Sequence, residues 1–163
     1  MVTTEGWTAY QPLLLLMGYI LLASVLVQWS LGSISFMETM RYFMAGFFLC
    51  FSFFKLLDLR AFADAYAGYD LLAARWHGWG YVYPFVELAL GIAYLANFAP
   101  PLTDAITIAV MGFSALGVIQ AVRKKQKIRC ACLGTVFKLP MSTVTIVEDL
   151  GMVAMAAAML AMR

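Results

Sequence analysis

The stretch Tyr10–Trp29, YQPLLLLMGYILLASVLVQW, contains no charged residue, and none occurs between Glu5 and Glu38. An α-helix rises about 1.5 Å per residue, so about 20 apolar residues cross the hydrocarbon core of a bilayer. Aromatic rings such as those of Tyr10 and Trp29 are typical of helix ends at the membrane interface. The stretch therefore predicts a transmembrane helix.

The rest of the chain has a similar composition. Of its 163 residues, 64% are hydrophobic and 12% are charged, whereas about 25% are charged in a typical soluble domain. Lipid must therefore cover much of the surface, and we expect a single integral membrane domain over residues 1–163. The net charge of +2 is scattered, and no basic stretch is long enough to predict a nucleic-acid partner.

Further apolar runs predict an all-α membrane protein, a bundle of about five helical segments of which four or five span the membrane. The expected spans are 10–29, 36–57, 80–98, 102–122 and 142–162. Residues 58–76 differ, because their apolar side chains recur at steps of three and four while the charged side chains fall elsewhere. This pattern predicts an interfacial amphipathic helix lying along the membrane surface.

The distribution of Lys and Arg predicts the orientation. If the basic loop 123–141 is cytoplasmic, five spans place residues 55–78 on the same side, and that side then holds nine of the eleven Lys and Arg residues. Cytoplasmic loops are enriched in these residues. We therefore expect a multi-pass protein of the bacterial inner (cytoplasmic) membrane with a cytoplasmic N-terminus.

Two cysteines in this loop, Cys130 and Cys132, are the sharpest chemical signal. A disulfide between residues two apart closes a small strained ring that exchanges readily, and the nearby Arg129 and Lys127 favour the reactive thiolate. The pair can therefore cycle between dithiol and disulfide, although cysteines in an apolar loop can also simply pack. Cys50, in the second span, is either a third thiol that relays electrons or a packing residue.

Acidic residues inside apolar spans form a second set of candidates. Glu87, Glu148 and Asp149 are costly in hydrocarbon, so we expect them to face the bundle interior and to pair or to handle protons. The candidate partners in the same polar network are Lys55, Asp58 and Asp70. The sequence leaves open which of these groups pair.

Methionines suggest an alternative chemistry. One stripe at steps of four and three contains Met141, Thr145, Glu148, Met152, Met155, Met159 and Met162. Thioethers and thiolates are ligands that Cu(I) selects. The alternative interpretation is therefore a carrier of a soft metal, copper or mercury. Its expected ligands are Cys50, Cys130, Cys132, Met141 and Met152. Against it, methionines commonly fill irregular gaps in packed helices, and outside this alternative we predict no cofactor.

Several short motifs carry a family resemblance. They are FFKLLDL at 53–59, YVYP at 81–84, ELALG at 87–91, and CACLG at 130–134 with Leu139-Pro140 and Glu148-Asp149. These motifs resemble those of the DoxX-like membrane proteins, and in particular of the MauE (methylamine-utilisation) family. The resemblance covers about residues 36–155.

The resemblance implies a redox-associated role at the inner membrane. Members of the family are linked to maturation of the disulfide-rich small subunit of methylamine dehydrogenase, alongside a thioredoxin-like partner. Relatives occur near or fused to glutaredoxin-like or heavy-metal-associated domains. Besides membrane lipid, a protein of one of these three kinds is the expected partner.

Our leading hypothesis is a thiol-redox membrane protein in which Cys130 and Cys132 cycle and Cys50 is a possible relay. The soft-metal carrier and an inert scaffold for a redox partner are the alternatives. Cytoplasmic cysteines raise one difficulty, since disulfide formation outside the cytoplasm would require electrons to cross the bilayer.

Overall fold

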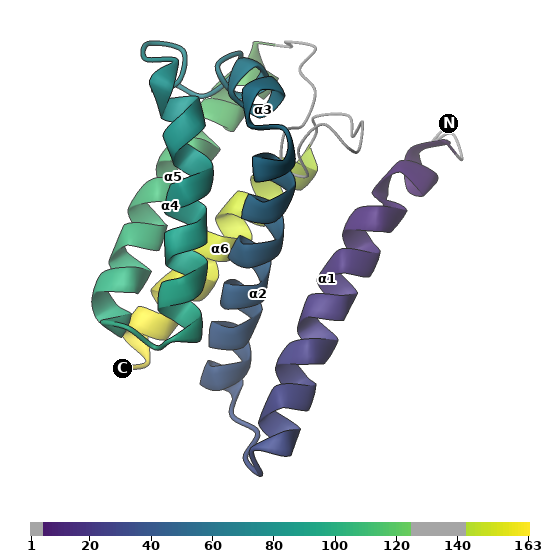
Figure 1. The fold of residues 1–163 in the computed structure, drawn as a ribbon, viewed down its shortest axis with the longest axis vertical. Helices are drawn as coiled ribbons and strands as arrows, with labels where there is room; N and C mark the ends of the chain where they lie inside the picture. Colours follow the sequence, from purple (N-terminus) through teal and green to yellow (C-terminus); the bar gives the residue numbers. More distant parts are fainter. Residues whose placement is uncertain (1–4, 125–142) are drawn as a thin grey trace.

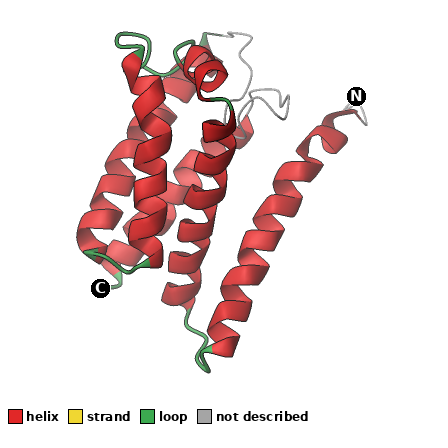
Figure 2. Cartoon of the chain, in the orientation of Figure 1, coloured by secondary structure: helices red, strands yellow, loops and turns green. Residues whose placement is uncertain are grey.

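The helices of the structure follow the apolar runs of the sequence. The computed structural model describes residues 5–124 and 143–163, with side chains from Gln11 to Lys124 and from Ile146 onward. The helices are α1 (Glu5–Ser30), α2 (Phe36–Leu57), α3 (Leu59–Tyr66), α4 (Gly78–Leu95), α5 (Pro100–Arg123) and α6 (Thr143–Ala161) (Figures 1 and 2). The described residues contain no strand, which confirms an all-α protein.

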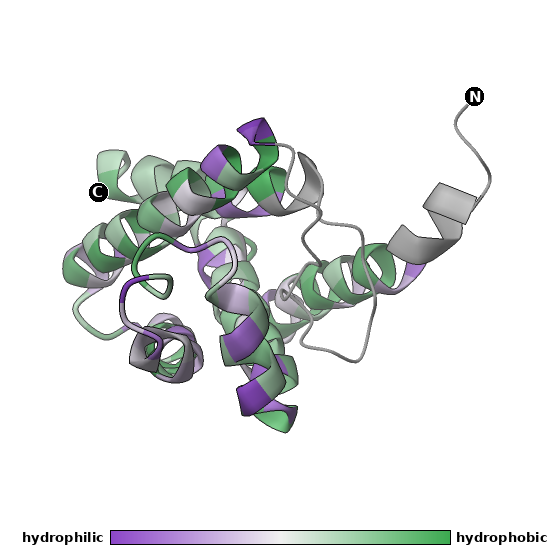
Figure 3. Ribbon diagram, turned by 90° about the horizontal axis from the view of Figure 1, so that it is seen from above, coloured by the Kyte–Doolittle hydropathy of each residue, from purple (hydrophilic) through white to green (hydrophobic). Residues whose placement is uncertain are grey.

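Three helices in the described part of the chain are long and apolar enough to cross a membrane. They are Gln11–Ser30, Phe36–Leu57 and Pro100–Arg123, judged by length and composition. Their outer faces expose large apolar side chains; Leu15, for example, is 63% exposed and Leu116 57% exposed. Hydrophobic residues dominate the long helices when the bundle is viewed along its axis (Figure 3). These surfaces suit lipid, and the chain is an all-α membrane protein.

Helices α4 and α6 complete the bundle. Figure 1 shows α4 and α5 side by side, with α6 crossing behind α2, while α1 stands at the outside against α2. The number of spans, five in our sequence analysis, stays a prediction because α4 and α6 do not meet the same length and composition criteria within the described residues.

The ends of the helices have local causes. Helix α2 has the expected bounds, 36–57. Helix α4 ends at Leu95 rather than at residue 98, because Asn97 and Ala99 take left-handed backbone conformations with φ of 53° and 39°. Pro100 then begins α5, a position in which its missing N–H costs nothing.

The amphipathic helix expected over residues 58–76 is shorter in the structure. Helix α3 ends at Tyr66, and residues 67–77 form a series of turns. Asp70 explains part of this difference. Its Oδ1 accepts hydrogen bonds from the backbone N–H groups two and three residues later, at 2.9 and 2.8 Å, and such side-chain bonds stabilise turns in competition with a continuing helix.

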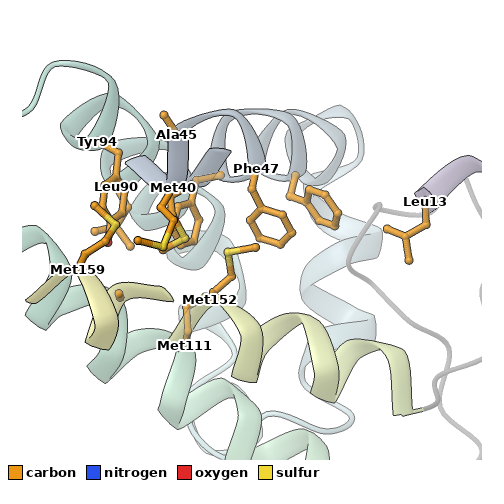
Figure 4. Close-up of a cluster of buried hydrophobic side chains, with 13 residues drawn as sticks. Leu13, Met40, Ala45, Phe47, Leu90, Tyr94, Met111, Met152 and Met159 are labelled. Atoms are coloured by element: carbon orange, nitrogen blue, oxygen red, sulfur yellow. The ribbon is translucent and has the colours of Figure 1, made fainter. Parts of the chain in front are cut away.

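The main hydrophobic core lies where α2, α4, α5 and α6 meet (Figure 4). Its buried side chains include Met44, Phe47, Phe48 and Phe51 from α2, Leu90 and Tyr94 from α4, Met111 from α5, and Met152 and Met159 from α6. Flexible methionines here fill the space between rigid aromatic rings. A second cluster joins α3 and the following turns to α4 and α5, and includes Phe62, Tyr66, Tyr69, Tyr83 and Val118.

The turns of residues 67–77 lie against the last part of α5. A Cβ atom on Gly117 would come within 2.9 Å of the Tyr69 carbonyl oxygen and 3.2 Å of the Asp70 Cα, so only glycine allows this approach. The turns and the Arg123 end of α5 therefore share one end of the bundle (Figure 1). The predicted orientation requires this arrangement, although which end faces the cytoplasm stays a prediction.

We predict that Gly117→Ala destabilises the protein by about 1–3 kcal/mol, because its neighbours are backbone atoms that cannot yield locally. Gly112→Ala, in the same helix, is the matched control because a Cβ there meets nothing within 4 Å. That control should leave stability unchanged or raise it by up to about 1 kcal/mol, since alanine favours helix. Thermal unfolding in detergent measures both, and equal stability of the two variants would contradict the close approach.

Candidate functional site: a buried ion pair among aromatic rings

The most unusual feature of the interior is a buried ion pair between α2 and α4. The Lys55 Nζ donates to both carboxylate oxygens of Glu87 at 2.6 Å. The two side chains are 6% and 1% exposed. Charges removed from water are costly unless they are paired and hydrogen-bonded, so each of these residues requires the other.

Aromatic rings surround the ammonium group. The Lys55 Nζ lies 5.0 Å from the ring centroid of Tyr83 and 5.4 Å from that of Phe62. A cation within about 6 Å of a ring centroid is attracted by the negative face of the ring. Tyr66 completes the group, with its ring centroid 4.8 Å from that of Tyr83 and 5.1 Å from that of Phe62. The charge is therefore stabilised by one carboxylate and by the faces of aromatic rings.

The local sequence positions these groups. Tyr83 and Glu87 are four residues apart in α4 and so lie on one face of that helix. Lys55 is in the last turn of α2, and Phe62 and Tyr66 are four apart in α3, which follows after a single residue. The sharp connection between α2 and α3 folds the aromatic face of α3 over the Lys55 side chain. Asp58 fixes that connection, because its side chain accepts a hydrogen bond from the Ala61 N–H at 3.1 Å.

Hydroxyl groups of the tyrosines extend the polar site. The Tyr83 hydroxyl donates to the Met111 Sδ at 3.6 Å. Burial, and then the neighbouring Asp70 carboxylate, raise the pKa of the Tyr66 phenol well above its usual range, so this hydroxyl keeps its proton. The Tyr66 Oη and the Asp70 Oδ2 are both buried, and Asp70 and Ser114 are the polar side chains that act on the Tyr66 hydroxyl.

Helix α6 adds two more acids to the interior. Glu148 is 9% exposed and Asp149 6% exposed, and both have interaction partners in the structure. The structure thus brings Lys55 together with Glu87 and buries Glu148 and Asp149 in α6.

A second buried polar cluster lies toward the other end of the bundle. Asp104 is completely buried, accepts a hydrogen bond from the Tyr94 hydroxyl at 3.0 Å, and pairs with Arg163 at 3.2 Å. Arg41 donates to the backbone carbonyl of Tyr94 at 2.7 Å and pairs with Glu38. Sequence reasoning did not select this cluster, because Asp104 lies close to the start of an apolar run and looked like a helix-end residue.

The cysteines are only partly described. Cys50 is a half-buried free thiol in α2, and it lines an apolar groove between α1 and α2 together with Tyr19 and Leu49. Cys130, Cys132 and Met141 lie outside the described residues. In the parts of the chain that the structure describes, no three or more His, Cys, Asp or Glu side chains are arranged to hold a metal ion.

The methionines of α6 have a packing role. Met152 and Met159 are 1% and 0% exposed within the main core, and Met155 packs against it. Figure 4 shows Met152 near the Phe47 ring and Met159 near Leu90. This environment favours the packing interpretation of the methionine stripe.

Three aromatic residues of the site, Phe62, Tyr66 and Tyr83, were absent from our sequence-based candidates. In the sequence, Phe62 and Tyr66 are part of an amphipathic pattern and Tyr83 belongs to a cluster of aromatic residues typical of a membrane interface. The spacing of four between Tyr83 and Glu87 was the available signal, because it places a ring beside a buried acid.

Comparison with known proteins connects this site to a family. Residues 33–162 match the family described as methylamine utilisation protein MauE. The comparisons with curated proteins and with solved structures give no significant match. The family match includes the ion pair of α2 and α4 as well as Cys130 and Cys132.

We predict that Lys55→Met destabilises the protein by about 3–5 kcal/mol, because it leaves the Glu87 carboxylate buried without its partner. The double variant with Lys55→Met and Glu87→Leu should recover most of this loss, since apolar side chains replace the pair. Thermal unfolding in detergent provides the comparison, with Lys124→Met at the exposed end of α5 as the control. Additive losses in the double variant would show that the two side chains are energetically independent.

Proposed function

The chain belongs to the MauE family of methylamine utilisation proteins, and from this premise we propose that it is a membrane thiol-redox protein that performs disulfide chemistry on a partner during maturation. The observation that carries the proposal is the family match over residues 33–162, because that range includes Cys130 and Cys132. In this proposal these two cysteines are the redox pair.

The proposed step is an exchange between two disulfides. A thiolate of the partner attacks the disulfide between Cys130 and Cys132, which forms a mixed disulfide and releases one cysteine of this chain as a thiolate. The second thiol of the partner then attacks the mixed disulfide and releases the other cysteine. The partner leaves with a new disulfide, and the two cysteines of this chain leave as a dithiol that holds the two electrons. Transfer of the disulfide from this chain to the partner is favoured in two ways. A disulfide between residues two apart is strained, and the neighbouring cations stabilise the thiolates that are released.

The buried acids are assigned to proton handling. Thiol–disulfide exchange consumes and releases protons at the sulfur atoms, and Glu87 and Glu148 are ionisable groups inside the bundle. Their burial supports this role, as intramembrane ionisable residues commonly act in proton transfer. Cys50 keeps its proposed role as a relay thiol.

The partner and the location are also part of the proposal. A thioredoxin-like protein offers the reactive dithiol that the exchange requires, with glutaredoxin-like and heavy-metal-associated proteins as the other classes. The excess of Lys and Arg on one side supports an inner-membrane protein with its N-terminus and the Cys130–Cys132 loop in the cytoplasm. No observation favours the soft-metal carrier as a second function, since the buried α6 methionines serve as core residues.

We predict that Cys130 and Cys132 interconvert between dithiol and disulfide in membranes. The full chain carrying Cys50→Ser leaves these two thiols as the only ones, so acid quenching and alkylation with a mass-tagged maleimide should give no tag after oxidation and two tags after reduction. Adding Cys132→Ser should trap a mixed disulfide with the oxidised partner, because the Cys130 thiolate attacks the partner disulfide and no second thiol of this chain remains to resolve it.

Three results would contradict the proposal. If both thiols stay reduced under oxidising conditions, the pair does not cycle, and an unchanged partner after replacement of both cysteines would instead favour a scaffold. Copper or mercury bound stoichiometrically to the purified protein, and lost in Cys132→Ser, would favour the soft-metal carrier.

A further inference from the structure

A polar pocket lies at the end of the bundle where the turns after α3 meet the last part of α5. Its lining includes Arg75 from the turns, and Gln120 and Lys124 from α5. Its volume is about 240 Å³, below the roughly 300–1,000 Å³ that is typical of a pocket enclosing a whole small molecule. The pocket therefore suits one group of a larger ligand.

The side chains that the pocket offers to a ligand are cationic and polar. Arg75, Gln120 and Lys124 are exposed, and neither cation forms an ion pair in the part of the chain that the structure describes. One acid, Asp70, also lines the pocket, but it is 1% exposed and two backbone N–H groups already bind its Oδ1. Two cations and an amide together call for an anion with several acceptor oxygens, such as a phosphate.

An apolar stripe on α5 leads directly to this pocket. Exposed positions of α5 recur at steps of three and four residues, and so lie on one face of the helix; they are 106, 109, 113, 116, 120 and 124. Ile106, Phe113 and Leu116 are the large apolar side chains of this stripe, at 40%, 40% and 57% exposed. At a rise of 1.5 Å per residue, Phe113 lies about 10 Å along the helix from Gln120. The lipid-facing surface of a helix long enough to span the membrane therefore ends in a cationic pocket.

The pocket and the stripe together limit the ligand. A free phosphate would use the cations and leave the stripe empty, whereas an acyl chain alone would use the stripe and leave the cations without a partner. A phospholipid joins a phosphate to acyl chains and can use both. A headgroup with net negative charge fits better than a zwitterionic one, which would bring a further cation next to Arg75 and Lys124. Basic pockets between membrane helices bind anionic headgroups in this way.

We propose that this pocket binds the headgroup phosphate of an anionic phospholipid whose acyl chains lie along the exposed stripe of α5. Arg75 and Lys124 pair with the phosphate oxygens, and the Gln120 amide donates a hydrogen bond to one of them. The lipid thus links the turns to α5, two segments that already pack closely at Gly117. No cysteine takes part, so this inference is independent of the thiol-redox function.

The test measures lipid binding directly. The full chain, freed of lipid in dodecyl maltoside, is titrated with dioleoylphosphatidylglycerol or dioleoylphosphatidylcholine, and native mass spectrometry gives the bound fraction. Phosphatidylglycerol should bind more tightly, and Arg75→Gln and Lys124→Gln should each weaken its binding about fivefold, or about 25-fold together. Arg60→Gln is the matched control, because Arg60 is an exposed cation of α3 that does not line the pocket. Its affinity should equal that of the unmodified chain.

A second measurement separates lipid binding from a structural role of the cations. Without lipid, Arg75→Gln and Lys124→Gln should unfold at the same temperature as the unmodified chain, because neither cation has an ion-pair partner among the described residues. Phosphatidylglycerol should raise the unfolding temperature of the unmodified chain more than that of either variant, since a ligand of the folded state stabilises it.

Four results would overturn the inference. Equal affinity for the two lipids would show that headgroup charge is not recognised, and an equal loss of affinity in Arg60→Gln would show a general effect of surface charge. Glycerophosphoglycerol, the headgroup without acyl chains, should bind far more weakly than the lipid; equal binding would identify a site for a soluble phosphate ester. A lower unfolding temperature of both pocket variants without lipid would assign the two cations to the fold.

Discussion

The contact between the Lys55 ammonium and the Glu87 carboxylate constrains the rest of the structure. Neither charge is stable alone in an apolar interior, so α2 and α4 must meet in the register that joins them at 2.6 Å. The same two helices approach closely further along, where a Cβ atom on Gly91 would lie 2.9 Å from the Leu49 Cγ. The ion pair and the close approach at Gly91 thus fix the packing of α2 against α4 at two positions along the helices.

The position of the ion pair also explains the aromatic cluster around it. Pairing neutralises the two charges, but the ammonium group has further donor capacity and its side chain is only 6% exposed. The Phe62 and Tyr83 rings supply that stabilisation, and they can do so because α3 folds back over α2 immediately after Lys55. At the other end of the bundle, Asp104, Tyr94 and Arg163 form a separate polar contact. The main core between these two polar regions is formed by aromatic and methionine side chains.

Much of the fold could be predicted from the sequence because apolar runs have a direct physical meaning. Uncharged runs of about 20 residues predict membrane helices, and the bounds of α2 agreed with that analysis. The amphipathic pattern after Asp58 was real but misjudged in length, since the Asp70 side chain competes with the helix for backbone N–H groups. Local turn chemistry of this kind is hard to separate from helical periodicity, because both place polar residues at similar intervals.

The site was less predictable, for a different reason. Glu87 was selected because an acid in an apolar span is costly, but its partner depends on how two helices pack, and Lys55 is 32 residues away along the chain. Tyr83 was interpreted as an interfacial residue although its ring is 3% exposed. The methionines of α6 were open to a metal or a packing role, and their burial among aromatic rings favours packing. Cys130 and Cys132 lie outside the described residues, so their chemistry rests on the sequence and on family membership.

The most direct test of the central contact is magic-angle-spinning NMR on the full chain in lipid bilayers, with ¹⁵N at the lysine Nζ and ¹³C at the glutamate Cδ positions. The account predicts a strong dipolar coupling between the Lys55 Nζ and the Glu87 Cδ that disappears in Glu87→Gln with its unlabelled side chain. Absence of this coupling in the unmodified protein, or a coupling that survives the substitution, would contradict a bundle organised around this ion pair.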